Sequence, residues 1–255
     1  MNVGSLLPRH ARYRGDHTAL VVGDLRLSFR ELNSYVNRLA NALLAAGMKK
    51  GDKFTTVLPN CLELMAAYWA AAKTGLVVVP ASPMLQDTGL ATLVEDSDSV
   101  LVIADASFGD ALDHIRSDLP KVADNGFVLV GMGGERPGFQ SYDSLIEVAS
   151  EDEPPEAGIT GDDLFNIMYS SGTTGAPKGI IHTHYVRSVY CTHFASNFRM
   201  SPESVVLHAG SIVFNGAMLD LMPWMYLGAT YILHETFDAG RVIETIAAEK
   251  ATHMV

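Results

Sequence analysis

The sequence predicts an α/β fold in which mainly parallel sheets are flanked by helices on both faces. Short apolar strands alternate with amphipathic helices between residues 53 and 130, and this alternation is typical of parallel strands joined by helical crossovers. Hydrophobic residues make up 48% of the chain, which indicates a globular protein rather than a disordered one. With 255 residues, the chain can bury a core as one large domain or two smaller ones.

Local signals predict the elements of the first half. Ser28 and Glu31 have the spacing of a capping box, so a helix is expected to begin after Ser28 and to end at Gly47. Asn60 is expected to cap a second helix that ends at Gly75. The other expectations for this half are strands over 18–22, 25–28, 53–58, 77–79, 100–104 and 127–130, and helices near 88–95 and 109–118.

The second half follows an acidic segment over 151–156, which contains two prolines and predicts a linker. We expect strands over 164–168, 179–183, 205–207 and 229–233, helices near 185–198 and 217–227, a last helix capped by Asp238, and another strand starting at 252. The predicted parts are 1–50, a hairpin and helix that pack with the second sheet; 51–200, a first α/β subdomain; and 201–255, the start of a second, truncated α/β subdomain.

Charge and composition exclude several classes of partner. The formal net charge is −11, from 29 acidic and 18 basic residues, which disfavours nucleic acid and anionic membrane surfaces. The apolar stretch 209–233 is long enough to span a bilayer, but glycines and Pro223 interrupt it, so we expect buried core and no membrane span. Cys61 and Cys191 form neither a disulfide nor a metal pattern, and no secretory signal is recognisable at the start, which favours a cytoplasmic location.

One loop carries the chemistry of a phosphate site. Between two apolar strands stand four hydroxyl side chains, two glycines and one lysine: Ser170, Ser171, Gly172, Thr173, Thr174, Gly175 and Lys178. Glycine lets backbone N–H groups turn toward one centre, hydroxyls add donors, and lysine adds a mobile positive charge. The loop is not a Walker A motif, because Pro177 stands where that motif requires glycine. Composition alone equally fits a solvated turn.

The order of residues favours the phosphate site. Ser170 to Gly179 reads Ser-Ser-Gly-Thr-Thr-Gly-Ala-Pro-Lys-Gly and resembles the phosphate loop of the adenylate-forming (AMP-binding) superfamily, in its acyl-CoA synthetase, or carboxylate–CoA ligase, branch. The segments 27–32 and 72–80 also resemble conserved segments of that family. The resemblance implies the layered αβαβα large domain of the family, here incomplete, because the chain resembles only the amino-terminal portion.

The resemblance also implies roles for individual residues. Ser170, Ser171, Gly172, Thr173, Thr174, Gly175 and Lys178 would contact the phosphates of ATP, with Lys178 also acting in catalysis. The segment 208–218 is similar to the region beside the family's acyl pocket, which implies substrate contacts for Phe214, Asn215, Gly216 and Met218; Phe214 as a plain core residue fits equally well. His182, His184, His193 and His208 have no cysteine or carboxylate cluster beside them, so no metal ligands are assigned.

The implied activity is that of an ATP-dependent carboxylate–CoA ligase that forms an acyl-adenylate, with ATP, Mg²⁺ and CoA as cofactors or co-substrates. An uncharged fatty or aromatic acid is favoured because the pocket segment lacks an aspartate. Two alternatives stay open: an amino-acid adenylation domain, and a non-catalytic nucleotide-binding domain. Because the family's adenine, ribose and Mg²⁺ contacts come from a carboxyl half without counterpart here, the chain alone is expected to be inactive. Apolar surface left uncovered would favour self-association, for example as a homodimer.

Overall fold

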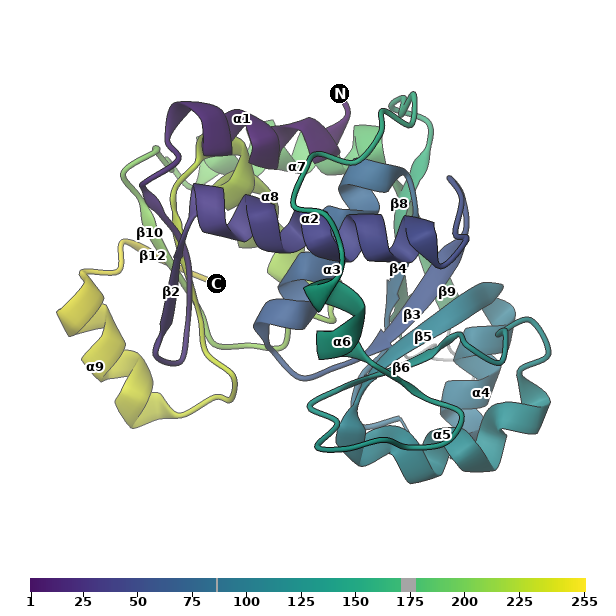
Figure 1. Cartoon of the computed structure of the whole chain (residues 1–255). Helices are drawn as coiled ribbons and strands as arrows, with labels where there is room; N and C mark the ends of the chain where they lie inside the picture. The colour runs from purple at the N-terminus through teal and green to yellow at the C-terminus, as the bar shows by residue number, and fades with distance from the viewer. Residues whose placement is uncertain (86, 171–177) are drawn as a thin grey trace.

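The computed structural model describes residues 1–85, 87–170 and 178–255. It confirms the predicted α/β fold, with two mainly parallel sheets flanked by helices. Figure 1 shows the sheets on either side of a central group of helices, with α9 outside one sheet and α4 and α5 outside the other. The described helices are α1 (Leu6–Tyr13), α2 (Phe29–Ala45), α3 (Leu62–Thr74), α4 (Asp87–Asp96), α5 (Gly109–Ile115), α6 (Tyr142–Glu147), α7 (His184–Asn197), α8 (Met218–Leu227) and α9 (Ala239–Glu249).

The five-stranded sheet joins the two ends of the chain. Its order is β12-β10-β11-β1-β2, and β1 pairs in parallel with β11 but antiparallel with β2. The predicted hairpin therefore packs in the same sheet as the strands from the last fifty residues. The strands are β1 (Thr18–Val22), β2 (Leu25–Ser28), β10 (Val205–His208), β11 (Thr230–Leu233) and β12 (His253–Met254). The proposed division of the chain after residues 50 and 200 stays a prediction.

The seven-stranded sheet has the order β7-β6-β5-β3-β4-β8-β9. All neighbours are parallel except β8 and β9, which form an antiparallel pair at one edge. The strands are β3 (Lys53–Val57), β4 (Val77–Pro80), β5 (Ser99–Asp105), β6 (Phe127–Val130), β7 (Gln140–Ser141), β8 (Leu164–Ser170) and β9 (Lys178–Thr183).

Burial on both sheet faces explains the layers. Successive side chains of a strand point to opposite faces. In β5, Leu101 and Ile103 join the core around the central helices, whereas Val102 and Ala104 pack with α4 and α5. On the outer face of the five-stranded sheet, Val242 of α9 packs against strand residues. Both sheets are covered on both faces, as expected for parallel strands.

Helix starts were predicted well where the signal is local. Ser28 and Glu31 form the expected capping box of α2, and Asp238 caps α9. The prediction for Asn60 is wrong, because the cap of α3 is the Cys61 thiol, which accepts from the Leu64 N–H. Helices α1 and α6 had not been predicted. None of the described helices is long and apolar enough to cross a membrane.

The predicted linker is irregular in structure but is tied to the central helices. Lys73, on α3, is almost fully buried. Its Nζ donates to Asn33 Oδ1 and Asn37 Oδ1, each at 2.6 Å, and to Glu153 Oε2 at 2.7 Å. Burial lowers the pKa of Lys73 to about 8, against the opposing effect of Glu153. These three hydrogen bonds tie the segment that leads into β8 to the central helices.

Buried neutral histidines predict sensitivity to acid. Burial lowers the pKa of His10, His182 and His184 from 6.5 to about 4. Between these values the unfolded chain binds more protons than the folded chain, so the free energy of unfolding falls as the pH drops from about 7 toward 4. Urea unfolding of a His184→Gln variant should show a loss smaller by about 1–3 kcal/mol over this range.

The matched control is His114→Gln, since His114 is exposed. Its pH dependence should equal that of the original chain. A His184→Gln variant with an unchanged slope would contradict the assignment of His184 as a buried neutral group.

Candidate active site

Two strands bring the ends of the predicted phosphate loop together. Ser170 is the last residue of β8 and Lys178 the first of β9, and the two are direct partners in the antiparallel ladder. Both side chains are exposed. The predicted contacts between them, Ser171, Gly172, Thr173, Thr174 and Gly175, lie outside the described residues. The loop therefore begins and ends at one point of the sheet.

This point lies at the carboxyl edge of the seven-stranded sheet. Strand β8 runs parallel to β4 through the pair Val78–Asn166. The chain leaves β4 toward β5 on one side and leaves β8 toward β9 on the other. Neighbouring strands whose connections diverge leave a crevice at their carboxyl ends, and α/β proteins bind ligands in such crevices.

A cavity of about 590 Å³ occupies this crevice. Its volume is in the range of small-molecule sites. Most of its lining is apolar, and none of the described lining residues is acidic. The lining residues are Pro80, Ser82, Met84, Leu85, Leu93, Met168, Tyr169, Ser170, Ile180, Val213, Phe214 and Asn215. The cavity thus reaches from Ser170, where the predicted phosphate loop begins, to the predicted substrate residues Phe214 and Asn215.

Asn60 holds the segment that carries Phe214. Its Nδ2 donates to the Gly210 and His234 carbonyls at 2.6 and 2.8 Å, and its Oδ1 accepts from the Ile212 N–H at 2.9 Å. The buried Tyr68 hydroxyl donates to the Ile212 carbonyl at 2.8 Å. These bonds explain why Asn60 is not a helix cap: both ends of its amide are used in tertiary contacts.

The four predicted substrate residues separate into two groups. Phe214 and Asn215 line the cavity, and Phe214 is 48% exposed, so it is not a core residue. Met218 is fully buried in the central core, and Gly216 is exposed with open space around it. The structure therefore places only the first two at the cavity. Substrate contact by any of the four stays a prediction.

The Tyr169 side chain lies between the β8–β9 strand pair and α4. Its hydroxyl donates to Asp96 Oδ2 at 2.5 Å, and burial followed by the Asp96 charge raises the pKa of Tyr169. Its ring lies over Gly179, its ladder partner: a Cβ on Gly179 would stand 3.0 Å from the ring carbon Cζ and 2.9 Å from Ile167. A side chain at 179 would therefore press on Ile167 and on the Tyr169 ring, which glycine avoids.

The cations near the cavity differ in kind. Lys178 is exposed and makes no ion pair with a described carboxylate. Arg187, on α7, is fully buried, and burial lowers its pKa to about 10, so it remains charged. His182 and His184 are neutral at pH 7, with pKa values of about 4. No group of three or more His, Cys, Asp or Glu in the described part of the chain could hold a metal ion.

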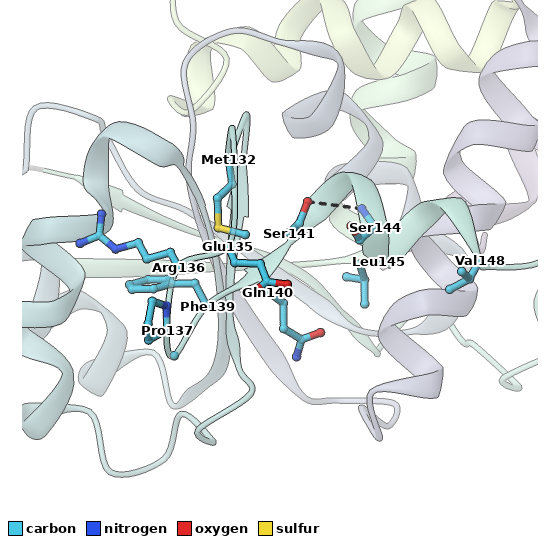
Figure 2. Close-up of a pocket in the computed structure, with 11 residues that line it drawn as sticks. Met132, Glu135, Arg136, Pro137, Phe139, Gln140, Ser141, Ser144, Leu145 and Val148 are labelled. Atoms are coloured by element: carbon cyan, nitrogen blue, oxygen red, sulfur yellow. Dashed lines mark hydrogen bonds between the residues drawn. The ribbon is translucent and has the colours of Figure 1, made fainter.

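A second hollow, of about 670 Å³, lies at the other edge of the same sheet (Figure 2). It is lined by the loop after β6 and by α6. Arg136, the one cation among its described lining residues, is paired with Asp110 at 2.6 Å and with Asp113 at 2.8 Å. Of the predicted site residues that the structure describes, none lines it. The cavity beside Ser170 is therefore the candidate active site.

The comparison with known families agrees with this geometry. A family model described as "AMP-binding enzyme" matches residues 7–255. The chain belongs to the AMP-binding enzyme family. The long-chain-fatty-acid–CoA ligase FadD13 of Mycobacterium tuberculosis is 32% identical over 89% of this chain and 43% of its own length. Feruloyl-CoA synthase of an Amycolatopsis species is 29% identical over 98% of this chain and 47% of its length. The chain spans less than half of these AMP-binding relatives.

Solved structures of the family share the fold. The inhibitor-bound amino-terminal domain of FACL13 from Mycobacterium tuberculosis is 29% identical, with a TM-score of 0.85 over 99% of this chain and 62% of that one. The O-succinylbenzoate coenzyme A synthetase of Bacillus subtilis, solved in complex with AMP, is 26% identical, with a TM-score of 0.83 over 98% of this chain and 60% of that one. The resemblance stated from the phosphate loop is confirmed.

Sequence reasoning missed part of the cavity wall. Ser82 and Met84 follow β4, and Tyr169 precedes the phosphate loop, yet all three line the same cavity. The only sequence signal was their position just before or after the ends of parallel strands, which meet at one edge. Arg187 carried no signal, because a single arginine in a helix is usually exposed.

The position of Phe214 gives a prediction about substrate size. Phe214→Ala in the complete protein should shift preference toward bulkier acids, because the ring fills part of the cavity mouth. Since the side chain is 48% exposed, the free energy of unfolding should fall by less than about 1 kcal/mol, whereas a core Phe→Ala costs about 3–5 kcal/mol. Phe198→Ala is the control, as Phe198 is 36% exposed and is not among the cavity residues. Loss of stability with an unchanged ranking of acids would place the acyl pocket elsewhere.

Proposed function

We propose that this chain is the amino-terminal part of an ATP-dependent carboxylate–CoA ligase that works through an acyl-adenylate. The observation that carries the proposal is the meeting, at one sheet edge, of both ends of the phosphate-loop sequence and an apolar cavity of about 590 Å³. A polyphosphate and an apolar acid are the two ligands that such neighbours suit. Membership of the AMP-binding family supports it.

The proposed chemistry has two steps. A carboxylate oxygen attacks the α-phosphorus of ATP, and the bond to pyrophosphate breaks. The thiolate of CoA then attacks the acyl carbon, and the bond to AMP breaks. In the first step Lys178 would meet the negative charge that builds on the departing pyrophosphate, which is electrostatic stabilisation of the transition state. The cavity would hold the acyl group so that its carboxylate points toward the phosphate loop.

Mg²⁺ belongs to the proposal as a companion of ATP. The described residues include no group of three or more His, Cys, Asp or Glu that fits a metal ion. We propose that Mg²⁺ enters the site together with the phosphates of ATP. Cytoplasmic location and homodimer formation also stay predictions.

An uncharged acyl group is favoured over an amino acid. No acidic side chain lines the described part of the cavity, so a substrate ammonium group would be desolvated without a counter-charge, which is unfavourable. The relatives' names include both fatty and aryl acids. ATP–pyrophosphate exchange across a panel of fatty, aryl and amino acids tests the proposal. Exchange with amino acids only would favour the adenylation-domain alternative, and nucleotide binding without exchange would favour a binding domain.

Lys178→Ala in the complete protein should weaken the use of ATP far more than the binding of the acid. A charge-assisted hydrogen bond to phosphate contributes about 1.5–3 kcal/mol, which corresponds to a loss of about ten- to a hundredfold in kcat/KM for ATP. Lys49→Ala is the matched control, because Lys49 is equally exposed but lies in the turn before β3, at the opposite end of the strands. Unchanged kinetics for ATP would remove Lys178 from the site.

The 255-residue chain by itself should fold but should not form an acyl-adenylate. Both sheets bury their two faces with residues of this chain, which supports folding. Phosphate and acyl contacts alone do not align the carboxylate with the α-phosphorus, and alignment contributes much of the rate. Pyrophosphate release with ATP, Mg²⁺ and fatty or aryl acids is the measurement. Turnover above background that Lys178→Ala abolishes would contradict this prediction.

A further inference from the structure

A buried cation stands directly behind the cavity wall. Arg187 is fully buried, although buried charges in proteins are normally paired with an opposite charge. No carboxylate in the described ranges lies within ion-pair distance of its guanidinium group. The partners of this charge are neutral groups, and two of them face the cavity.

The guanidinium group donates hydrogen bonds to three side chains and lies over the ring of a fourth. Its Nε donates to Asn166 Oδ1 at 2.9 Å, and its Nη1 donates to Asn215 Oδ1 at 3.0 Å. Its Nη2 lies 3.6 Å from the Met168 sulfur, and its Cζ lies 5.1 Å from the centre of the Tyr190 ring. Met168 and Asn215 line the cavity. Arg187 thus fixes part of the wall without being exposed in it.

These contacts determine how Asn215 is oriented. A guanidinium group has donors only, so the atom of Asn215 that faces it must be the oxygen. The amide nitrogen then points away from Arg187. Its only hydrogen-bond partner among the described residues is the Tyr190 hydroxyl, at 3.5 Å, which is at the limit of a hydrogen bond. At least one N–H of Asn215 therefore remains to donate to a ligand.

We propose that Arg187 is a positioning residue that makes Asn215 a hydrogen-bond donor in the acyl cavity, and that the site selects carboxylic acids whose acyl part carries a neutral acceptor oxygen. Hydroxyl, methoxy and carbonyl groups are such acceptors. This inference rests on the proposed function, since it assigns the acyl group to this cavity. A plain hydrocarbon acid would leave the Asn215 N–H buried without a partner, and sites built around a donor discriminate against such ligands.

The test is binding of matched acids to the 255-residue chain without ATP, by isothermal titration calorimetry. Benzoate is compared with 2-, 3- and 4-hydroxybenzoate, and decanoate with hydroxydecanoates. At least one hydroxy acid should bind about tenfold more tightly than its parent acid, as expected for one added hydrogen bond. The quantity compared below is the ratio of the affinity for the hydroxy acid to the affinity for its parent acid. Asn215→Leu and the isosteric Asn215→Asp, which removes the donor, should both bring this ratio close to one.

Arg187 is tested through the same ratio. Arg187→Met should lower it, because the Asn215 amide is then free to turn its oxygen toward the cavity, and Arg187→Lys should restore part of it. The double variant Arg187→Met with Asn215→Leu should lower the ratio no further than Asn215→Leu alone. Arg12→Met, which changes an exposed arginine on α1, is the control. If Arg187→Met fails to fold by circular dichroism, the two Asn215 variants and Arg187→Lys decide.

The outcomes separate this inference from the proposed function. A ratio near one in the original chain, or a ratio that survives Asn215→Leu, overturns the inference even if the complete protein catalyses ATP–pyrophosphate exchange. An equal weakening of both acids by Arg187→Met, which would leave the ratio of their affinities unchanged, would show a purely structural role and overturn the positioning role. Failure of a folded chain to bind any acid overturns it as well. A preserved ratio without exchange in the complete protein would support the inference and contradict the ligase.

Discussion

The site depends on the pairing of β8 with β9. Strand β8 is parallel to β4, which anchors it in the buried sheet, and antiparallel to β9, which returns the chain to the same edge. At the ladder pair Tyr169–Gly179 the aromatic ring lies over the glycine, and a Cβ at 179 would stand 3.0 Å from the ring carbon Cζ. The same ring reaches Asp96 on α4. One ladder therefore fixes the ends of the phosphate loop and one wall of the cavity.

Two buried polar side chains hold connecting segments in place. Lys73 ties the segment before β8 to α2 and α3, and Asn60 ties the segment after β10 to the end of β11. In both cases a polar side chain that is costly to bury finds hydrogen-bond partners: Lys73 bonds two asparagines of α2 and Glu153, and Asn60 bonds backbone groups of the segments after β10 and β11. The two segments fixed in this way are those that lead into β8 and into Phe214, so the buried polar bonds set the shape of the cavity.

The sequence predicts what is encoded locally. The capping box of α2, the cap of α9 and the strands on either side of the phosphate loop were all recovered, because each depends on residues a few positions apart. The family was recognised for the same reason, since its signature is a contiguous run of residues. Asn60 was assigned wrongly because its partners lie 150 residues or more away in the chain, and a local capping rule cannot anticipate them. Helix α1 escaped prediction because it is only eight residues long and has no side-chain cap at its start.

Several residues of the cavity wall could not be predicted from the sequence, for a related reason. Phe214 and Asn215 were found through the family resemblance, but Ser82 and Tyr169 reach the cavity only because β4 and β8 are neighbours, and nothing near them in the sequence indicates that pairing. Arg187 is a stronger case. An arginine on a helix with both polar and apolar neighbours is normally exposed. Arg187 is buried because α7 packs against β8 and against the segment after β10.

The two cations at this edge suit different tasks for physical reasons. The net charge of the chain is −11, so an anionic ligand depends on local positive groups. Lys178 is exposed and unpaired among the described residues, so its long side chain keeps its freedom to move. Arg187 cannot move, since burial and three side-chain contacts hold it. A fixed charge cannot follow a ligand, but it can hold a neighbouring dipole in one direction before the ligand arrives. Because the dipole is already oriented, no free energy is spent on orienting it when a ligand binds. A buried arginine behind an apolar wall can therefore orient a polar group of that wall.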